Sequence, residues 1–130
     1  MVWSRRSSKL RAFACVLALL LPGCQRPATA LVVTIEHEVS PLPARSGPAT
    51  IALRVSDVSG HAVTGARIRL EANMSHPGMA PVFAEAKETE PGRYQAHLEF
   101  TMAGDWIVLV NLIMSDGRKL EQQFEIKGVR

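Results

Sequence analysis

The chain has 130 residues, which is enough for one domain and little more. Its 15 basic and 12 acidic residues give a formal charge of +3, but four of the basic and none of the acidic residues fall within residues 1–23. The remainder therefore carries 11 basic against 12 acidic residues, a net charge of −1. No block of like charge remains there, which argues against binding of nucleic acid through its phosphates.

Residues 1–23 have the composition of an export signal. The basic start consists of Arg5, Arg6, Lys9 and Arg11. An apolar run follows at 12–21, which is shorter than the roughly 20 residues that span a bilayer and fits the apolar region of a signal peptide. The run ends in Leu21-Pro22-Gly23-Cys24, which resembles the lipobox of bacterial lipoproteins. In that class of protein the cysteine is lipidated and becomes the new N-terminus.

We therefore expect a lipoprotein signal peptide at 1–23, a lipidated tether at 24–30 and one domain at 31–130. The alternatives are an ordinary secretory signal, cleaved near Ala28 or Ala30, and an uncleaved anchor. The expected location is extracytoplasmic, anchored to a membrane through lipid on Cys24, on the periplasmic side if the cell has an outer membrane. Cys15 would leave with the signal, so no cysteine pair would remain for a disulfide.

From residue 31 onward, short β-branched and apolar segments alternate with turn signals. Seven strands are predicted, at 31–37, 50–55, 66–71, 82–88, 93–100, 106–113 and 120–126. Turn signals recur roughly every 8–12 residues, the spacing typical of an immunoglobulin-like sandwich, and no convincing helical period is present. The predicted fold class is therefore all-β, a seven-stranded immunoglobulin-like β-sandwich.

Two of these segments predict how the core is built. Residues 93–100 alternate cleanly, with an inward set that begins at Tyr94 and ends at Phe100. Residues 106–113 are apolar on both faces, as in a central strand, so we expect Trp106 to belong to the core.

The loop predicted at 73–81 carries the most distinctive chemistry in the sequence. It reads Met74-Ser-His76-Pro-Gly-Met79, which places two thioethers and one imidazole at a Pro-Gly turn. Thioether is a soft ligand and imidazole a borderline one, so together they suit Cu(I) better than zinc and suit carboxylate-binding cations poorly. Thioether also needs no deprotonation and forms no disulfide.

Strand parity brings a further thioether toward this loop. In an up-and-down arrangement of seven strands, the loops after the first, third and fifth strands lie at one end of the sandwich, which we call the methionine pole. Met102 follows the fifth strand, and His37 ends the first predicted strand, so both are candidate ligands. The first strand begins at the opposite end, so the methionine pole should point away from the membrane. The alternative is that these methionines are flexible fillers at the end of the core.

The remaining histidines and methionine are expected to be structural. His61 lies in a turn and His97 on an outward strand face, so both are predicted to be surface residues. Met114, at the opposite end from the methionine pole, is predicted to pack.

Four segments together resemble a known family. They are Val63-Thr-Gly-Ala66, the loop from Met74 to Met79, Pro91-Gly-Arg-Tyr94, and Phe100-Thr-Met-Ala-Gly-Asp-Trp106. In this combination, over about residues 48–127, the chain resembles the YtkA-like domain, which is similar in turn to FixH-like proteins. The resemblance implies an immunoglobulin-like sandwich outside the cytoplasm, found in small lipoproteins and beside heavy-metal efflux and copper-handling components. FixH-like relatives are linked to cytochrome oxidase assembly, but they carry a membrane helix that this sequence does not predict.

Two functional hypotheses follow. The first is a lipid-anchored binding protein that handles copper or another soft metal through Met74, His76, Met79 and Met102, with Cu(I) as the bound ion. The second is a metal-free interaction or assembly module, whose partner would be a metal-handling or membrane-complex protein such as an oxidase or efflux component. An enzyme is not expected and no catalytic residue is assigned, because the sequence offers no plausible Ser-His-Asp or Cys-His set and no glycine-rich phosphate loop.

Overall fold

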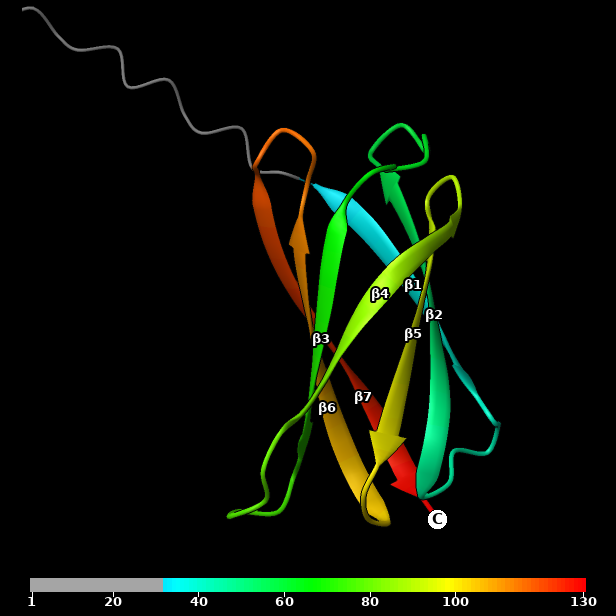
Figure 1. Ribbon diagram of the computed structural model, residues 1–130, viewed down its shortest axis with the longest axis vertical. Coiled ribbons are helices and arrows are strands. Elements are labelled where there is room, and N and C mark those ends of the chain that lie inside the picture. The colour runs from blue at the N-terminus through cyan, green and yellow to red at the C-terminus, as the bar shows by residue number, and fades with distance from the viewer. Residues whose placement is uncertain (1–31) are drawn as a thin grey trace, which may run out of the picture.

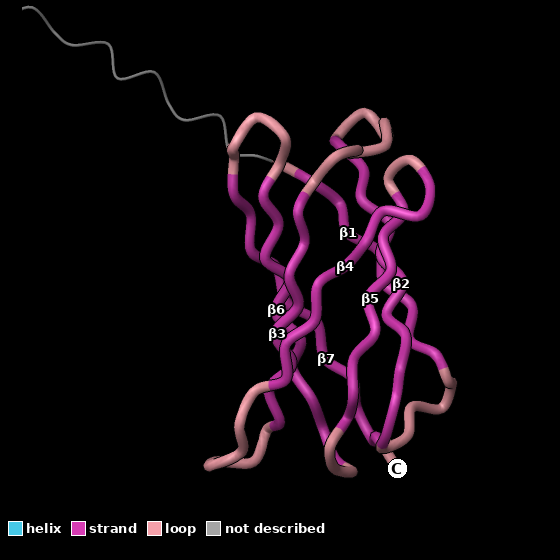
Figure 2. Tube along the Cα trace, in the orientation of Figure 1, coloured by secondary structure: helices cyan, strands magenta, loops and turns pink. Residues whose placement is uncertain are grey.

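The computed structural model describes residues 32–130, which form seven antiparallel strands and no helix (Figures 1 and 2). The strands are β1 (Val33–Ser40), β2 (Gly47–Asp57), β3 (Arg67–Met74), β4 (Val82–Glu90), β5 (Arg93–Phe100), β6 (Gly104–Ile113) and β7 (Lys119–Val129). The prediction of an all-β, immunoglobulin-like sandwich is confirmed. The predicted signal peptide and Cys24 lie outside the described residues. Within 32–130 there is no helix with the length and apolar character needed to cross a membrane.

The strands form one curled sheet, in the order β1-β2-β5-β4-β3-β6-β7. The curl occurs at β4, whose residues 82–86 pair with β3 and whose residues 87–90 pair with β5. The register shifts between Glu88 and Glu90. One half of the sheet therefore consists of β1, β2 and β5 and the other of β3, β6 and β7, the division typical of immunoglobulin-like sandwiches.

The core lies between the two halves, as alternation predicts. The four inward residues of β5, from Tyr94 to Phe100, are all buried. Strand β6 buries alternate residues beginning with Trp106, and the residues between them are half-buried. This second face is sheltered because β6 lies between β3 and β7 in the sheet. Full burial of such an apolar side chain contributes about 1.5–3 kcal/mol, so these alternating residues supply the main favourable term for folding.

The hydroxyl of Tyr94 fixes the long loop between β2 and β3. It donates a hydrogen bond to the carbonyl of Val63 at 2.7 Å and accepts one from the backbone N–H of Ala66 at 3.1 Å. Burial raises the pKa of this hydroxyl above its ordinary value. The loop is thus attached to the buried end of a core side chain.

The loops divide between two ends of the sandwich. Figure 1 shows the loops after β1, β3 and β5 at the end where the C-terminus lies, and the start of β1 with the other three loops at the opposite end. The predicted parity of the loops is therefore confirmed. The methionine pole lies at the opposite end of the domain from Val33, the first residue of β1.

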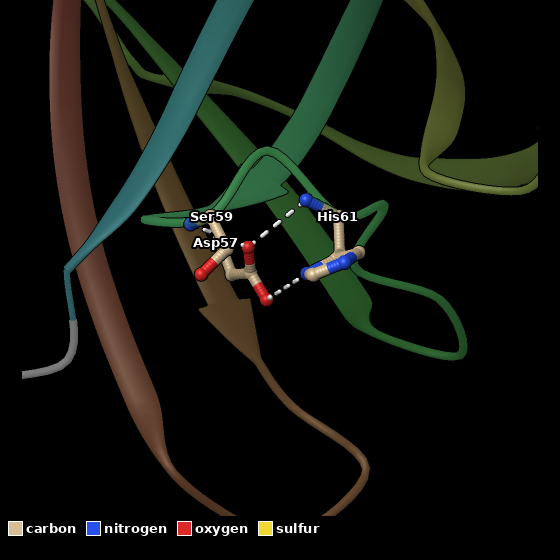
Figure 3. Close-up of polar contacts among 3 residues, drawn as sticks. All are labelled: Asp57, Ser59 and His61. Carbon is tan, nitrogen blue, oxygen red and sulfur yellow. Dashed lines mark hydrogen bonds and ion pairs between the residues drawn. The ribbon is translucent and has the colours of Figure 1, made fainter.

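At the opposite end, Asp57, Ser59 and His61 form a compact turn (Figure 3). Asp57 Oδ1 accepts hydrogen bonds from the backbone N–H groups of Ser59 at 2.8 Å and His61 at 2.9 Å, and Oδ2 lies 3.5 Å from His61 Nδ1. The bond from the His61 backbone holds the pKa of Asp57 below its ordinary value. Since Ser59 and His61 both contribute backbone N–H groups, the carboxylate of Asp57 closes the turn. His61 is a surface residue, as predicted.

Candidate metal centre at the methionine pole

Met74 is the last residue of β3, although the sequence predicts it within a loop. It pairs with Trp106 of β6, and the preceding Asn73 pairs with Ile107. The ladder between β3 and β6 therefore runs three residues beyond residue 71, where the strand is predicted to end. As a result, the backbone of Met74 belongs to the sheet, while His76 and Met79 lie in the loop beyond it.

An open hollow of about 470 Å³ lies between the β3–β4 and β5–β6 loops. We call it the methionine hollow, and it is lined by Met74, Ser75, His76, Pro77, Met79, Met102, Ala103, Gly104 and Asp105. Four of the five candidate ligands predicted from the sequence line it, namely Met74, His76, Met79 and Met102. The fold thus brings Met102 to the same cavity as Met74, from a different loop.

The candidate ligands differ in exposure. Met79 and Met102 are 39% and 47% exposed, and His76 is exposed, whereas Met74 is half-buried and packs against the core. The hollow therefore has one sheltered thioether at its base and three donors that solution can reach.

Ser75 connects the β3–β4 loop to the start of β6. Its backbone N–H and its Oγ both donate to the carbonyl oxygen of Asp105, at 3.0 and 2.7 Å. Asp105 is in turn held from the other side, because its Oδ1 accepts a hydrogen bond from Gly128 N at 2.8 Å. Ser75 lies between Met74 and His76, so this contact sets where both of them stand relative to the β5–β6 loop.

Two further features shape the junction between the β5–β6 loop and β6. Gly104 has a φ of +134°, and a Cβ there would lie 2.7 Å from Met74 Cε, so the glycine leaves room for the Met74 side chain. The buried Trp106 donates from Nε1 to the Met102 carbonyl at 3.1 Å, and its ring lies 5.4 Å from that of Phe100. Trp106 is thus the core residue that the sequence predicts, and it also anchors the backbone of Met102.

The donor set of the hollow is soft. Its lining offers three thioethers and one imidazole, and its single carboxylate, that of Asp105, already accepts the Gly128 bond. Across residues 32–130, no group of three or more His, Cys, Asp or Glu side chains is placed to hold a metal ion. These residues fit a soft ion such as Cu(I), and they fit zinc, calcium or magnesium poorly.

His37 does not reach the methionine pole. β1 continues to Ser40, so the expectation that His37 ends the strand is wrong, and the residue pairs with Leu53 in mid-strand. Its ring stacks on that of Phe124 of β7, with centroids 3.8 Å apart, and burial lowers its pKa. His37 therefore helps to join the two edge strands of the curled sheet.

The other predicted structural residues lie where expected. His97 is exposed on β5, with Nδ1 3.3 Å from Thr50 Oγ1. Met114 is half-buried and packs against the core. Neither lines the methionine hollow.

Comparison with known families identifies the domain. A model of the family described as YtkA-like matches residues 28–111. The chain belongs to the YtkA-like family. The match confirms the resemblance found in the sequence, although it starts and ends earlier than the expected 48–127. It contains both loops of the methionine hollow.

No curated protein matches the chain. Among solved structures, the chain is similar to the crystal structure of the PmoD soluble domain from a Methylocystis species (strain Rockwell), at 15% identity and a TM-score of 0.49, over 75% of this chain and 91% of that chain.

Proposed function

We propose that this YtkA-like protein binds Cu(I), or another soft metal ion, in the methionine hollow and carries it outside the cytoplasm. The observation that supports this most is the meeting of three thioethers and one imidazole, from the end of β3 and two separate loops, in one cavity. Loop methionines that only filled the end of the core would not need to share a cavity with an exposed histidine. The metal is cargo in this account, and no catalytic residue is assigned.

Each donor has a distinct role in the proposed site. Met74 would supply the sheltered sulfur at the base, because its backbone belongs to β3 and its side chain packs on the core. His76, Met79 and Met102 would close around the ion from the exposed side. Thioethers and neutral imidazole bring no negative charge, so a monovalent soft ion is favoured over a divalent hard one.

The lipid anchor would determine where the cargo is presented. We propose that Cys24 is acylated and holds the protein at the membrane, on the periplasmic side if the cell has an outer membrane. The methionine pole lies at the opposite end of the domain from Val33. With a short tether, the hollow would then face the aqueous compartment and soluble or membrane-complex partners. Metabolic labelling with a fatty acid, lost in Cys24→Ser, tests this part of the proposal.

A competition titration tests metal binding. The purified protein is titrated under anaerobic conditions with Cu(I) held by a chromogenic chelator. Replacing Met74 and Met79 together with alanine should weaken binding by at least about tenfold, which corresponds to about 1.4 kcal/mol. Met114→Leu is the matched control, because Met114 lies outside the hollow. Unchanged affinity in the double variant would contradict the proposal.

The second candidate is a metal-free interaction or assembly module. The observation in its favour is the exposed apolar surface of the hollow itself, where Met79 and Met102 are 39% and 47% exposed. A photo-cross-linking amino acid at position 102 should then capture a partner in cells, whereas one at Val58, which is 73% exposed at the opposite end, should not. Capture that persists when copper is removed supports this candidate, and equal capture from both positions counts against it.

A further inference from the structure

The four methionines of the described residues fall into two pairs by exposure. Met79 and Met102 are 39% and 47% exposed and line the methionine hollow. Met74 and Met114 are half-buried and pack against the core. The two cysteines of the chain are Cys15 and Cys24, so residues 32–130 contain no thiol that could compete for an oxidant. The exposed thioethers are therefore the sulfur atoms of this domain that an oxidant in solution reaches first.

We propose that Met79 and Met102 form a reversible oxidation site that switches the methionine hollow between a metal-binding and a non-binding state. The oxidant would be a peroxide. A sulfur lone pair attacks one peroxide oxygen, the O–O bond breaks, the sulfur becomes a sulfoxide, and hydrogen peroxide is reduced to water. The sulfur loses two electrons and the peroxide gains two. Methionine sulfoxide reductases reverse this modification.

Oxidation would remove soft donors and leave the fold in place. A sulfoxide presents a hard oxygen in place of a free thioether lone pair, which suits Cu(I) poorly. Both residues lie in the hollow rather than in the buried core. The contact that holds Met102 uses its backbone carbonyl, which Trp106 Nε1 can still reach after the side chain is oxidised. Met74 would remain reduced, so the hollow would offer Cu(I) one thioether and the imidazole of His76 in place of three thioethers and that imidazole.

The inference rests on the proposed function, and its selectivity can be measured separately. Purified protein is treated with hydrogen peroxide, and peptide mass spectrometry follows the addition of one oxygen atom at each methionine. The same samples are assayed for Cu(I) affinity and for the midpoint of thermal unfolding. Met79 and Met102 should oxidise several-fold faster than Met74 and Met114, because exposure controls the reaction. Bound Cu(I) should slow oxidation of the first pair, since its sulfur lone pairs are then engaged.

Oxidised protein should bind Cu(I) at least about tenfold more weakly with an unchanged unfolding midpoint, and treatment with methionine sulfoxide reductases should restore the affinity. Met114→Leu should behave like the wild type throughout. Equal oxidation of Met74 and Met79 would overturn the selectivity. If untreated protein binds Cu(I) and oxidised protein binds it equally well, the switch is wrong and the proposed function stands. If untreated protein does not bind Cu(I), the proposed function fails and the switch fails with it.

Discussion

Replacing Ser75 with alanine tests whether the contact between the β3–β4 loop and the start of β6 pre-organises the methionine hollow for metal binding. The change removes the Oγ that donates to the Asp105 carbonyl at 2.7 Å and keeps the backbone N–H that donates to the same oxygen at 3.0 Å. No acceptor is left without a donor, so the cost is that of a single neutral hydrogen bond at an exposed position. We expect a loss of about 0.5–1 kcal/mol, the lower part of the range for such bonds.

That free energy converts to a measurable change in binding. If the β3–β4 loop must be held to β6 before Cu(I) binds, a loss of about 0.5–1 kcal/mol in that contact weakens the Cu(I) affinity about two- to fivefold. If the same bond also stabilises the whole fold, the unfolding midpoint should fall by about 2–6 °C for a domain of this size. Competition titration and thermal unfolding on the same preparation separate the two effects.

The conservative variant decides the interpretation. Ser75→Thr keeps a hydroxyl that can donate to the Asp105 carbonyl, so its affinity should stay close to that of the wild type. An unchanged affinity in Ser75→Ala would refute the role of this contact. Equal loss in both variants would show that a change of side-chain shape, rather than the hydrogen bond, affects the hollow.

Three further predictions concern stability. Tyr94→Phe leaves two backbone groups of the β2–β3 loop without their partner and should cost about 2–3 kcal/mol in urea unfolding. Gly92→Ala should lower the free energy of unfolding by about 2 kcal/mol or more, because φ is +74° and the new Cβ would lie 2.7 Å from Ala62 Cβ. A loss below about 0.5 kcal/mol would contradict this prediction. The pKa of Asp57 is lowered from 3.8, chiefly by the His61 backbone bond, so its ionised form contributes stability at neutral pH that is lost as the pH falls below 3.8. Any advantage of the wild type over Asp57→Asn in urea unfolding should therefore shrink between about pH 6 and pH 3.

The strands could be predicted from the sequence wherever one face is buried and a turn is marked. Strand β5 begins and ends where the alternation of Tyr94 to Phe100 and the preceding Pro-Gly turn place it. The end of β3 could not be predicted in this way. Asn73 and Met74 have loop-like neighbours, and they join the strand only because Ile107 and Trp106 of β6 offer them backbone partners.

The curl at β4 has no sequence signal for a similar reason. Residues 82–90 form one continuous strand, but they change partner from β3 to β5 near residue 87 and shift register after Glu88. Pairing across strands depends on how the two halves meet in space. Local alternation reports which face is buried and does not report which neighbour is bonded.

The side chains that line the candidate site could be predicted from the sequence, whereas the contacts that hold them in place could not. Met74, His76 and Met79 lie close together in the sequence and strand parity adds Met102, so residue type and topology were sufficient to predict that these side chains share one end of the fold. Ser75 and Gly104 were missed, because the partner of each is about 30 residues away in the sequence. A serine that bonds a distant carbonyl looks like any other loop serine until the fold is known.

In the proposed function, thioethers and an imidazole of the methionine hollow bind a soft metal ion. X-ray absorption spectroscopy of the Cu(I)-loaded protein tests it most directly, because sulfur and nitrogen neighbours give different copper–ligand distances. We expect copper to be coordinated mainly by thioether sulfur with an imidazole nitrogen, and we expect the sulfur signal to be lost in the variant with Met74, Met79 and Met102 replaced by alanine. A first shell of nitrogen and oxygen alone, or copper that is lost on gel filtration, would contradict it.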